Sequence, residues 1–304
     1  MQTKISNYLR LIAFSHTIFA MPFALLGFFL GVRNGLTDTE TTPGDGGLQD
    51  VIGGNIGLLL VLVVGCMVFV RSAAMAFNRY LDRSFDARNP RTLGREIPAG
   101  LVSPTSALLF TGVNSILFII CTFFINPLCF YLSPVALLVV LGYSYTKRFT
   151  PLCHLVLGLG LALAPLGAYL AVTGQFANLP LLFSLLVLCW VAGFDIIYSL
   201  QDEEFDRSQQ LFSIPVWLGK QRALYLSRVL HAVCAAVVLV AGGWGAFGLL
   251  YWVGAAVFIA MLGYQHWLVK PNDLRRVDRA FMTVNGIASL CFALFVITDL
   301  FLFS

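Results

Sequence analysis

The sequence predicts an all-α fold of the polytopic membrane class, a bundle of nine helices that cross the bilayer. Hydrophobic residues make up 59% of its 304 positions and charged residues only 11%, a balance far from that of soluble domains. One helical crossing takes about 20 apolar residues. Nine stretches approach that length, near residues 11–32, 56–77, 105–125, 128–145, 152–173, 180–200, 223–242, 246–268 and 281–303.

The first and fifth stretches carry small residues that favour close helix packing. Gly27 and Gly31 form a G-x-x-x-G pair, which lets two membrane helices approach each other closely. The N-terminus lacks a short apolar core followed by a small-residue cleavage site, so the first stretch is expected to be retained rather than removed as a signal peptide. The fifth stretch is expected to pack closely or to line a cavity. It contains Gly158, Gly160, Pro165 and Gly167.

The cysteines and histidines do not form a metal-binding pattern. All seven cysteines fall inside apolar stretches without a C-x-x-C spacing, which argues against a disulfide framework and against a structural zinc site. The four histidines are scattered, and none forms an H-x-x-x-H pair.

The distribution of basic residues predicts the orientation in the membrane. Sixteen of the nineteen Lys and Arg residues lie in the N-terminal segment or in the second, fourth, sixth and eighth loops. By the positive-inside rule these segments face the cytoplasm, and the expected location is the inner (cytoplasmic) membrane, crossed many times. Topology accounts for the net charge of +4, so no nucleic-acid partner is expected.

An acidic motif follows the second stretch. Asn78, Asp82 and Asp86 recur at four-residue spacing, so they share one face if the helix continues through them. Two carboxylates at this spacing repel each other by roughly 0.2 to 0.5 kcal/mol, and the C-terminal end of a helix also disfavours anions. A positive partner is therefore expected. One interpretation is a solvated face with Arg79 and Arg83 as local ion-pair partners.

A second acidic cluster follows the sixth stretch and favours a metal-binding interpretation of both. Carboxylate oxygens are the ligands of Mg²⁺ bound to a substrate phosphate, so two such clusters indicate a polyanionic ligand between them. The second cluster consists of Asp202, Glu203, Glu204 and Asp206.

Further polar residues are placed near these acids. Lys147 and Arg148 end the fourth stretch on the same side, where either topology or phosphate binding explains them. Asp195 lies two helical turns before Asp202, together with Tyr198. A carboxylate at that depth is costly and should face the interior, either paired with a base such as Arg71 or acting on a substrate.

Four segments together resemble the UbiA superfamily of intramembrane aromatic prenyltransferases, and within it the 4-hydroxybenzoate polyprenyltransferase-like group. They are NRYLDRSFD, RTLGREIPAG, YSYTKRFTPL and DIIYSLQDEEFD. The resemblance extends over nearly the whole chain and implies a single membrane domain over residues 1–304. It further implies nine membrane-spanning helices around a central cavity, which opens laterally to lipid and is capped by cytoplasmic helices.

The resemblance also implies an activity, a cofactor and partners. The expected reaction is the Mg²⁺-dependent transfer of a polyprenyl group from a polyprenyl diphosphate to an aromatic carboxylic acid in ubiquinone or menaquinone biosynthesis. The implied metal ligands are Asn78, Asp82, Asp86, Asp202 and Asp206, with Asp195 as a further catalytic residue. The implied substrate-binding residues are Asn78, Arg79, Arg83, Arg95, Tyr145, Lys147 and Tyr198. The partners would be the donor, the acceptor and membrane lipid.

The sequence departs from the family pattern at two places. Many members have a D-x-K-x-G run after the second motif, whereas Asp206 is followed here by Arg207, so the basic residue is displaced or lost. The loop reads REIPAG rather than RPLPSG, and this variant is similar to relatives of the futalosine route to menaquinone. The acceptor is then either 4-hydroxybenzoate or 1,4-dihydroxy-6-naphthoate.

Two other functions place acids near membrane helices. A CDP-alcohol phosphotransferase requires a D-G-x-x-A-R pattern, which DRSFDARNP does not provide. A divalent-cation transporter is expected to hold its acids near the middle of the membrane, whereas these clusters lie at one edge.

Overall fold

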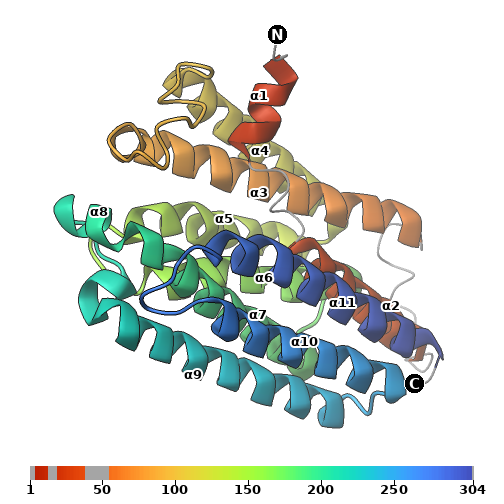
Figure 1. Ribbon diagram of the computed structural model, residues 1–304. Coiled ribbons are helices and arrows are strands. Elements are labelled where there is room, and N and C mark those ends of the chain that lie inside the picture. Colours follow the sequence, from red (N-terminus) through yellow and green to blue (C-terminus); the bar gives the residue numbers. More distant parts are fainter. Residues whose placement is uncertain (1–3, 13–18, 38–54, 303–304) are drawn as a thin grey trace.

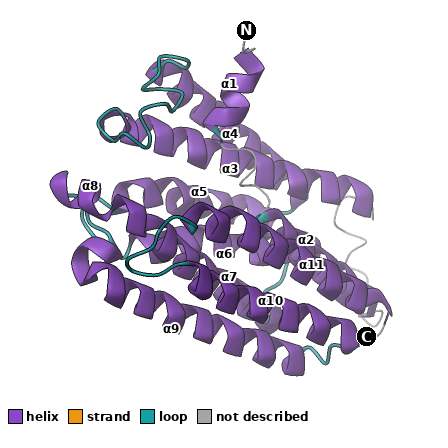
Figure 2. Cartoon of the chain, in the orientation of Figure 1, coloured by secondary structure: helices purple, strands orange, loops and turns teal. Residues whose placement is uncertain are grey.

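The computed structural model describes residues 4–12, 19–37 and 55–302, which form helices joined by turns and loops (Figure 1). No β-strand occurs within those ranges (Figure 2). The long helices are α2 (Met21–Thr37), α3 (Ile56–Asp86), α4 (Pro104–Ile125), α5 (Pro127–Thr146), α6 (Cys153–Thr173), α7 (Asn178–Ser199), α9 (Ile214–Trp244), α10 (Leu249–Leu268) and α11 (Asn285–Leu302). The short ones are α1 (Lys4–Leu11), η3 (Leu200–Asp202), α8 (Glu203–Ser208) and the π-helical turn η4 (Arg279–Val284).

The all-helical membrane fold predicted from the sequence is confirmed. In the described part of the chain, eight helical segments are long and apolar enough to cross a membrane, which makes the chain an integral membrane protein. The ninth predicted crossing, residues 11–32, corresponds to α2, which begins at Met21 and has 17 residues. Leu11 instead ends the separate helix α1, and residues 13–18 of the predicted crossing lie outside the described residues.

Helix α7 forms the centre of the bundle. Its membrane-spanning window is 61% buried inside the protein, compared with 22% for α3. Trp190 of α7 is fully buried and packs against aromatic rings from α2 and α10. Because protein surrounds α7 on several sides, the residues at its C-terminal end have a well-defined position in the bundle.

Glycines allow α2, α6 and α7 to pack closely, as predicted. A Cβ atom at Gly27 would overlap the carbonyl group of Pro165 on α6. A Cβ atom at Gly158 on α6 would lie 2.6 Å from the Leu188 carbonyl oxygen on α7. Backbones in such close contact leave no room for side chains, so these two positions determine how α6 lies against its neighbours.

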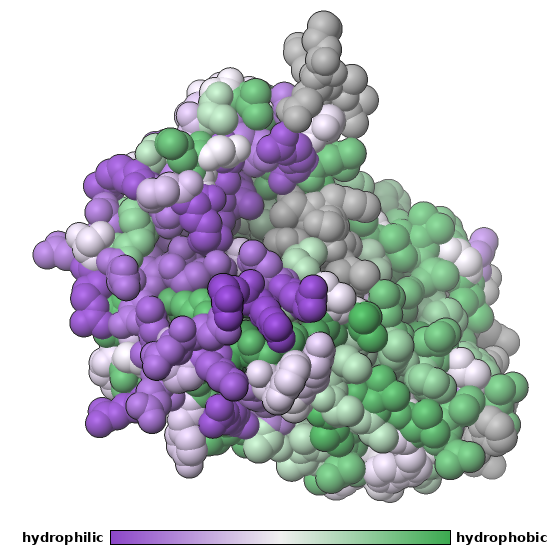
Figure 3. Space-filling model, in the orientation of Figure 1, coloured by the Kyte–Doolittle hydropathy of each residue, from purple (hydrophilic) through white to green (hydrophobic). Residues whose placement is uncertain are grey.

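A cavity of about 350 Å³ lies among α3, α4, α5 and α6. Its walls are almost entirely apolar, and include Gly160 and Gly167 of α6, but Arg71 and Tyr143 also line it. Figure 3 shows hydrophilic residues gathered at one end of the molecule, where α8 and the loop after α3 lie. Short elements cover this end: η3, α8 and the turns of residues 87–103.

We expect Asp299 of α11 to stabilise the opposite end of the bundle. Its buried carboxylate accepts hydrogen bonds from the backbone N–H groups of Gly248 (2.7 Å) and Tyr251 (3.2 Å) at the start of α10. Asp299→Ala leaves these donors unsatisfied and should lower the free energy of unfolding by about 1 to 3 kcal/mol. Thermal unfolding in detergent measures this. Leu294→Ala, at a position that is 66% exposed, serves as the control, and equal losses would contradict the capping role.

Candidate active site

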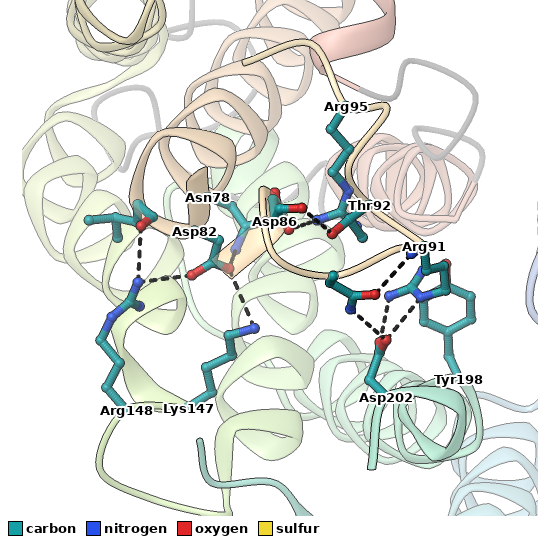
Figure 4. A network of polar contacts seen from close by, with 12 residues as sticks. Asn78, Asp82, Asp86, Arg91, Thr92, Arg95, Lys147, Arg148, Tyr198 and Asp202 are labelled. Carbon is teal, nitrogen blue, oxygen red and sulfur yellow. Dashed lines mark hydrogen bonds and ion pairs between the residues drawn. The ribbon is translucent and has the colours of Figure 1, made fainter. Parts of the chain in front are cut away.

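Helix α3 continues without a break through the first acidic motif, which is the condition under which its three polar residues share one face. It ends at Asp86, so Asn78, Asp82 and Asp86 project from one face near its C-terminus (Figure 4). The side-chain amide of Asn78 donates to Asp82 Oδ2 at 3.2 Å. Both aspartates are buried, so their negative charges would be costly without partners of opposite charge.

Cations from the end of α5 neutralise Asp82. Arg148 donates to Asp82 Oδ1 at 2.9 Å, and Lys147 Nζ lies 3.6 Å from Asp82 Oδ2. Arg148 also donates to the backbone carbonyl of Leu81 at 3.1 Å. The positive partner expected from the sequence is therefore present, but Arg148, which the predicted site omitted, makes the shorter ion pair.

Asp86 pairs with the loop that follows it. Arg95, a predicted site residue, donates to Asp86 Oδ1 at 2.7 Å, and the Thr92 hydroxyl donates to the Asp86 backbone carbonyl at 3.2 Å. The other carboxylate oxygen, Asp86 Oδ2, is buried and has no hydrogen-bond partner among the described residues. A buried anionic oxygen without a donor is unusual, and a bound cation would satisfy it.

Asp202, in the second motif, pairs with Arg91 of the same loop. The guanidinium donates from Nε to Asp202 Oδ1 at 2.9 Å and from a terminal nitrogen to Oδ2 at 2.5 Å. It also donates to the Tyr198 hydroxyl at 3.0 Å, and Asn89 donates to Asp202 Oδ1 at 3.3 Å. Burial by itself lowers the pKa of Arg91, but the hydrogen bonds and charges of Asp202 and Tyr198 raise it above the ordinary arginine value.

These contacts bring the two motifs to the same end of the bundle. In Figure 4, Asp82 and Asp86 lie on one side of the site, and Asp202 and Tyr198 on the other. Asp206 of α8 is also buried, and the charges of Lys147, Asp202 and Asp82 all act on it. Residues that are more than 110 positions apart in the chain thus face one another, as the sequence predicted.

Three predicted substrate-binding residues form no ion pair with the acidic motifs among the described residues. Arg83 donates to the Tyr80 carbonyl at 2.6 Å and lies over the Tyr80 ring. Tyr145 is 46% exposed, whereas Tyr143 lines the cavity. Arg79 has a buried Nε atom with no hydrogen-bond partner among the described residues.

Asp195 pairs with a histidine that sequence reasoning did not select. Its Oδ2 lies 2.7 Å from Nδ1 of His154, on α6, and this contact replaces the pairing with Arg71 that the sequence left open. His154 lies in the first turn of the apolar helix α6, two residues after the YSYTKRFTPL segment, and has no second histidine at metal-ligand spacing, so its sequence context gave little signal. Its role depends on the packing of α6 against α7.

The donor set at this end suits magnesium, although the described side chains do not form a complete site. Within these ranges, no three His, Cys, Asp or Glu side chains lie close enough together to hold a metal ion by themselves. The carboxylates are instead bound to Arg and Lys. Mg²⁺ commonly takes one or two carboxylates and completes its octahedron with water and substrate phosphate. The buried oxygen of Asp86 and the neighbouring oxygen ligands fit that mode of binding.

This end of the bundle combines buried carboxylates and basic side chains with an adjoining apolar cavity in an integral membrane protein. Comparison with known proteins gives the family. The model of the UbiA prenyltransferase family matches residues 47–287, so the chain belongs to that family and is a prenyltransferase.

Similar proteins include two named 4-hydroxybenzoate octaprenyltransferase. The one from Tolumonas auensis is 30% identical over 239 residues, which cover 79% of this chain and 83% of its own. The one from Aeromonas salmonicida is 31% identical over 252 residues, with 81% and 83% covered.

Solved structures share the fold. A UbiA homolog from Aeropyrum pernix K1 superposes with a TM-score of 0.74 at 28% identity, covering 92% of this chain and 95% of its own. A UbiA homolog from Archaeoglobus fulgidus, bound to DMAPP and Mg²⁺, has a TM-score of 0.73 at 20% identity, with 98% and 100% covered.

Arg91 should hold the loop of residues 88–102 against the second motif. Arg91→Ala removes the paired hydrogen bonds to Asp202 and should raise amide hydrogen exchange across this loop by about fivefold, since partly exposed ion pairs contribute roughly 1 kcal/mol. Mass spectrometry of peptides from the purified protein measures the exchange. Arg88→Ala is the matched control, because the contacts of Arg88 within the described part of the chain are local ones, to the Ser84 carbonyl and the Phe85 ring. Unchanged exchange in Arg91→Ala would refute this role.

Proposed function

We propose that this protein transfers a polyprenyl group from a polyprenyl diphosphate to an aromatic carboxylic acid in quinone biosynthesis, with Mg²⁺ as the cofactor. The observation that carries the proposal is the meeting of both acidic motifs with four basic side chains at one end of the bundle, beside an apolar cavity. The relatives named 4-hydroxybenzoate octaprenyltransferase and the homolog bound to DMAPP and Mg²⁺ support the donor and the metal.

The charged end would bind the diphosphate. Bound Mg²⁺ would screen the charge of the leaving diphosphate. Its ligands would come from Asn78, Asp82, Asp86, Asp202 and Asp206. The four cations now paired with carboxylates would shift toward the phosphate oxygens and stabilise the developing negative charge. These residues are Arg91, Arg95, Lys147 and Arg148.

The cavity would take the prenyl chain. Its walls are apolar, so an isoprenoid buries its surface there without leaving polar groups unsatisfied. The same walls exclude water when the carbon–oxygen bond of the allylic diphosphate breaks, and this protects the carbocation from hydrolysis. An electron-rich ring then attacks the allylic carbon.

Arg71 would bind the carboxylate of the acceptor. It lies on α3 four helical turns before the end of the helix, lines the cavity, and has a buried Nε atom without a hydrogen-bond partner among the described residues. A buried guanidinium in an apolar wall calls for an anion. A benzoate or a naphthoate meets this need, and both 4-hydroxybenzoate and 1,4-dihydroxy-6-naphthoate carry the required carboxylate.

The proposal includes a location and a domain boundary. Basic residues concentrate on the side that carries both acidic motifs, which favours a cytoplasmic active site in the inner membrane. The site draws on α3, the loop after it, the residues that follow α5 and the turn η3 after α7, so residues 1–304 are best regarded as one membrane domain.

Purified protein should release diphosphate from a polyprenyl diphosphate when an aromatic acid is added, and EDTA should stop this until Mg²⁺ is restored. Asp82→Asn should lower kcat by about 10² to 10³, the range seen when a group that stabilises the transition state is removed. Glu204→Gln is the matched control, because Glu204 is an exposed acid of the second cluster. Full activity of Asp82→Asn would refute the assignment of the site.

The acceptor is tested by offering 4-hydroxybenzoate and 1,4-dihydroxy-6-naphthoate in parallel and identifying the prenylated product by mass spectrometry.

With the accepted acid, Arg71→Gln should raise the acceptor KM by at least about tenfold, because a charge-assisted hydrogen bond is lost, and leave the donor KM unchanged. Arg228→Gln, an exposed arginine of α9, is the control. An unchanged acceptor KM in Arg71→Gln would show that the carboxylate binds elsewhere.

A further inference from the structure

Asp195 differs from the other acids of the site in its partner and in its exposure. The carboxylates of Asp82, Asp86 and Asp202 pair with arginine, whereas Asp195 contacts a histidine. The Asp195 side chain keeps 22% of its surface exposed, whereas the ring of His154 is almost fully buried. The histidine therefore lies on the protein side of the carboxylate and leaves the other side open.

The hydrogen bonds of His154 determine which ring nitrogen carries the proton. The backbone N–H of Ile214 donates to Nε2 at 3.3 Å. This N–H belongs to the first turn of α9, where backbone donors lack an intrahelical acceptor. Because Nε2 accepts, the proton of the neutral ring is on Nδ1 and is donated to Asp195 Oδ2 at 2.7 Å.

The packing of α6 against α7 keeps this pair in place. Gly158 lies one turn after His154 on the same face of α6, and its missing side chain allows contact with the Leu188 carbonyl, two turns before Asp195 on α7. His154 thus joins α6, α7 and the start of α9. One oxygen of Asp195 is held by the ring, and the geometry leaves Oδ1 for another group.

The open side of Asp195 belongs to the reaction site. Tyr198 follows Asp195 by three residues, about one turn, on the same face of α7, and its hydroxyl accepts a hydrogen bond from Arg91, which also pairs with Asp202. The charges of Asp195, Asp82 and Arg71 all act on the hydroxyl of Tyr143, which lines the cavity. Among the described residues, Tyr143 is thus near enough to both Asp195 and Arg71 to be affected by their charges, and Asp82, the other acid that acts on it, is already neutralised by Arg148 and Lys147.

We propose that Asp195 is the base that removes the ring proton of the acceptor and that His154 is its positioning residue, a role that rests on the proposed function. When the allylic carbon–oxygen bond breaks, its electron pair leaves with the diphosphate. A ring carbon then uses a π electron pair to form the new carbon–carbon bond. The carbon–hydrogen bond at that position breaks, its electrons restore the aromatic ring, and the proton passes to Asp195 Oδ1. No oxidant or reductant is needed.

The test is the kinetic isotope effect with acceptor deuterated at the ring position that becomes prenylated. Proton loss from such a cationic ring is fast when a base is in place, so the wild-type protein should show kH/kD near one. Asp195→Asn should lower kcat by about 10²-fold or more and raise kH/kD clearly above one, because proton removal becomes slow. His154→Leu should lower kcat about tenfold, also with a raised isotope effect.

A conservative variant and a control distinguish a positioning role of His154 from an effect on the stability of the protein alone. His154→Asn keeps an N–H donor near the place of Nδ1 and should recover most of the activity lost in His154→Leu. His231→Leu removes another buried histidine, in α9, whose contacts are the Trp190 carbonyl and His266. It should lower the melting temperature without raising kH/kD.

Three results would overturn the role of Asp195 and His154. Unchanged kcat in Asp195→Asn with an isotope effect near one would assign the proton to another base. Equal activity of His154→Asn and His154→Leu would remove the positioning role. Failure of the wild-type protein to prenylate either acid would overturn the proposed function, and the role of Asp195 and His154 with it. That outcome is distinguishable from the other two, because diphosphate release is then absent in the wild-type protein and in every variant.

Discussion

The structure depends on the neutralisation of buried carboxylates at one end of an apolar bundle. Asp82 and Asp86 end a 31-residue helix where the helix dipole disfavours anions, and both are shielded from water. Such charges are tolerated only when cations or donors lie beside them. Arg148, Lys147 and Arg95 meet that requirement and draw the end of α5 and the loop after α3 onto the motif.

The same ion pairs also assemble the site. Arg91 joins the loop after α3 to Asp202, so the two acidic motifs are held together by a residue that belongs to neither. A polyanionic substrate with its metal ions would offer these carboxylates and guanidinium groups new partners of opposite charge. The ion pairs of the substrate-free protein would then be exchanged for contacts with the substrate and its metal ions. Few charged groups would lose a partner of opposite charge in this exchange.

The rest of the bundle adds two rigid features to the charged end. Close packing of α6 on α7 at Gly158 brings His154 beside Asp195, and the burial of α7 on several sides fixes the position of Asp195 near its C-terminal end. The cavity lies among α3 to α6 and is apolar except for Arg71, Tyr143 and a few small polar groups. Charge at one end and an apolar wall along the helices match a substrate with a diphosphate head and an isoprenoid tail.

The sequence by itself determined the helices, the shared face of Asn78, Asp82 and Asp86, and the close packing at Gly27, because these follow from local periodicity and side-chain size. It also indicated that both acidic motifs meet at one membrane edge. Only the tertiary structure decided which base pairs with which acid. Arg148 and Asp82 are 66 positions apart, Arg91 and Asp202 are 111 apart, and His154 and Asp195 are 41 apart. Such pairs depend on the rotation and crossing of whole helices, which no local pattern in the chain specifies.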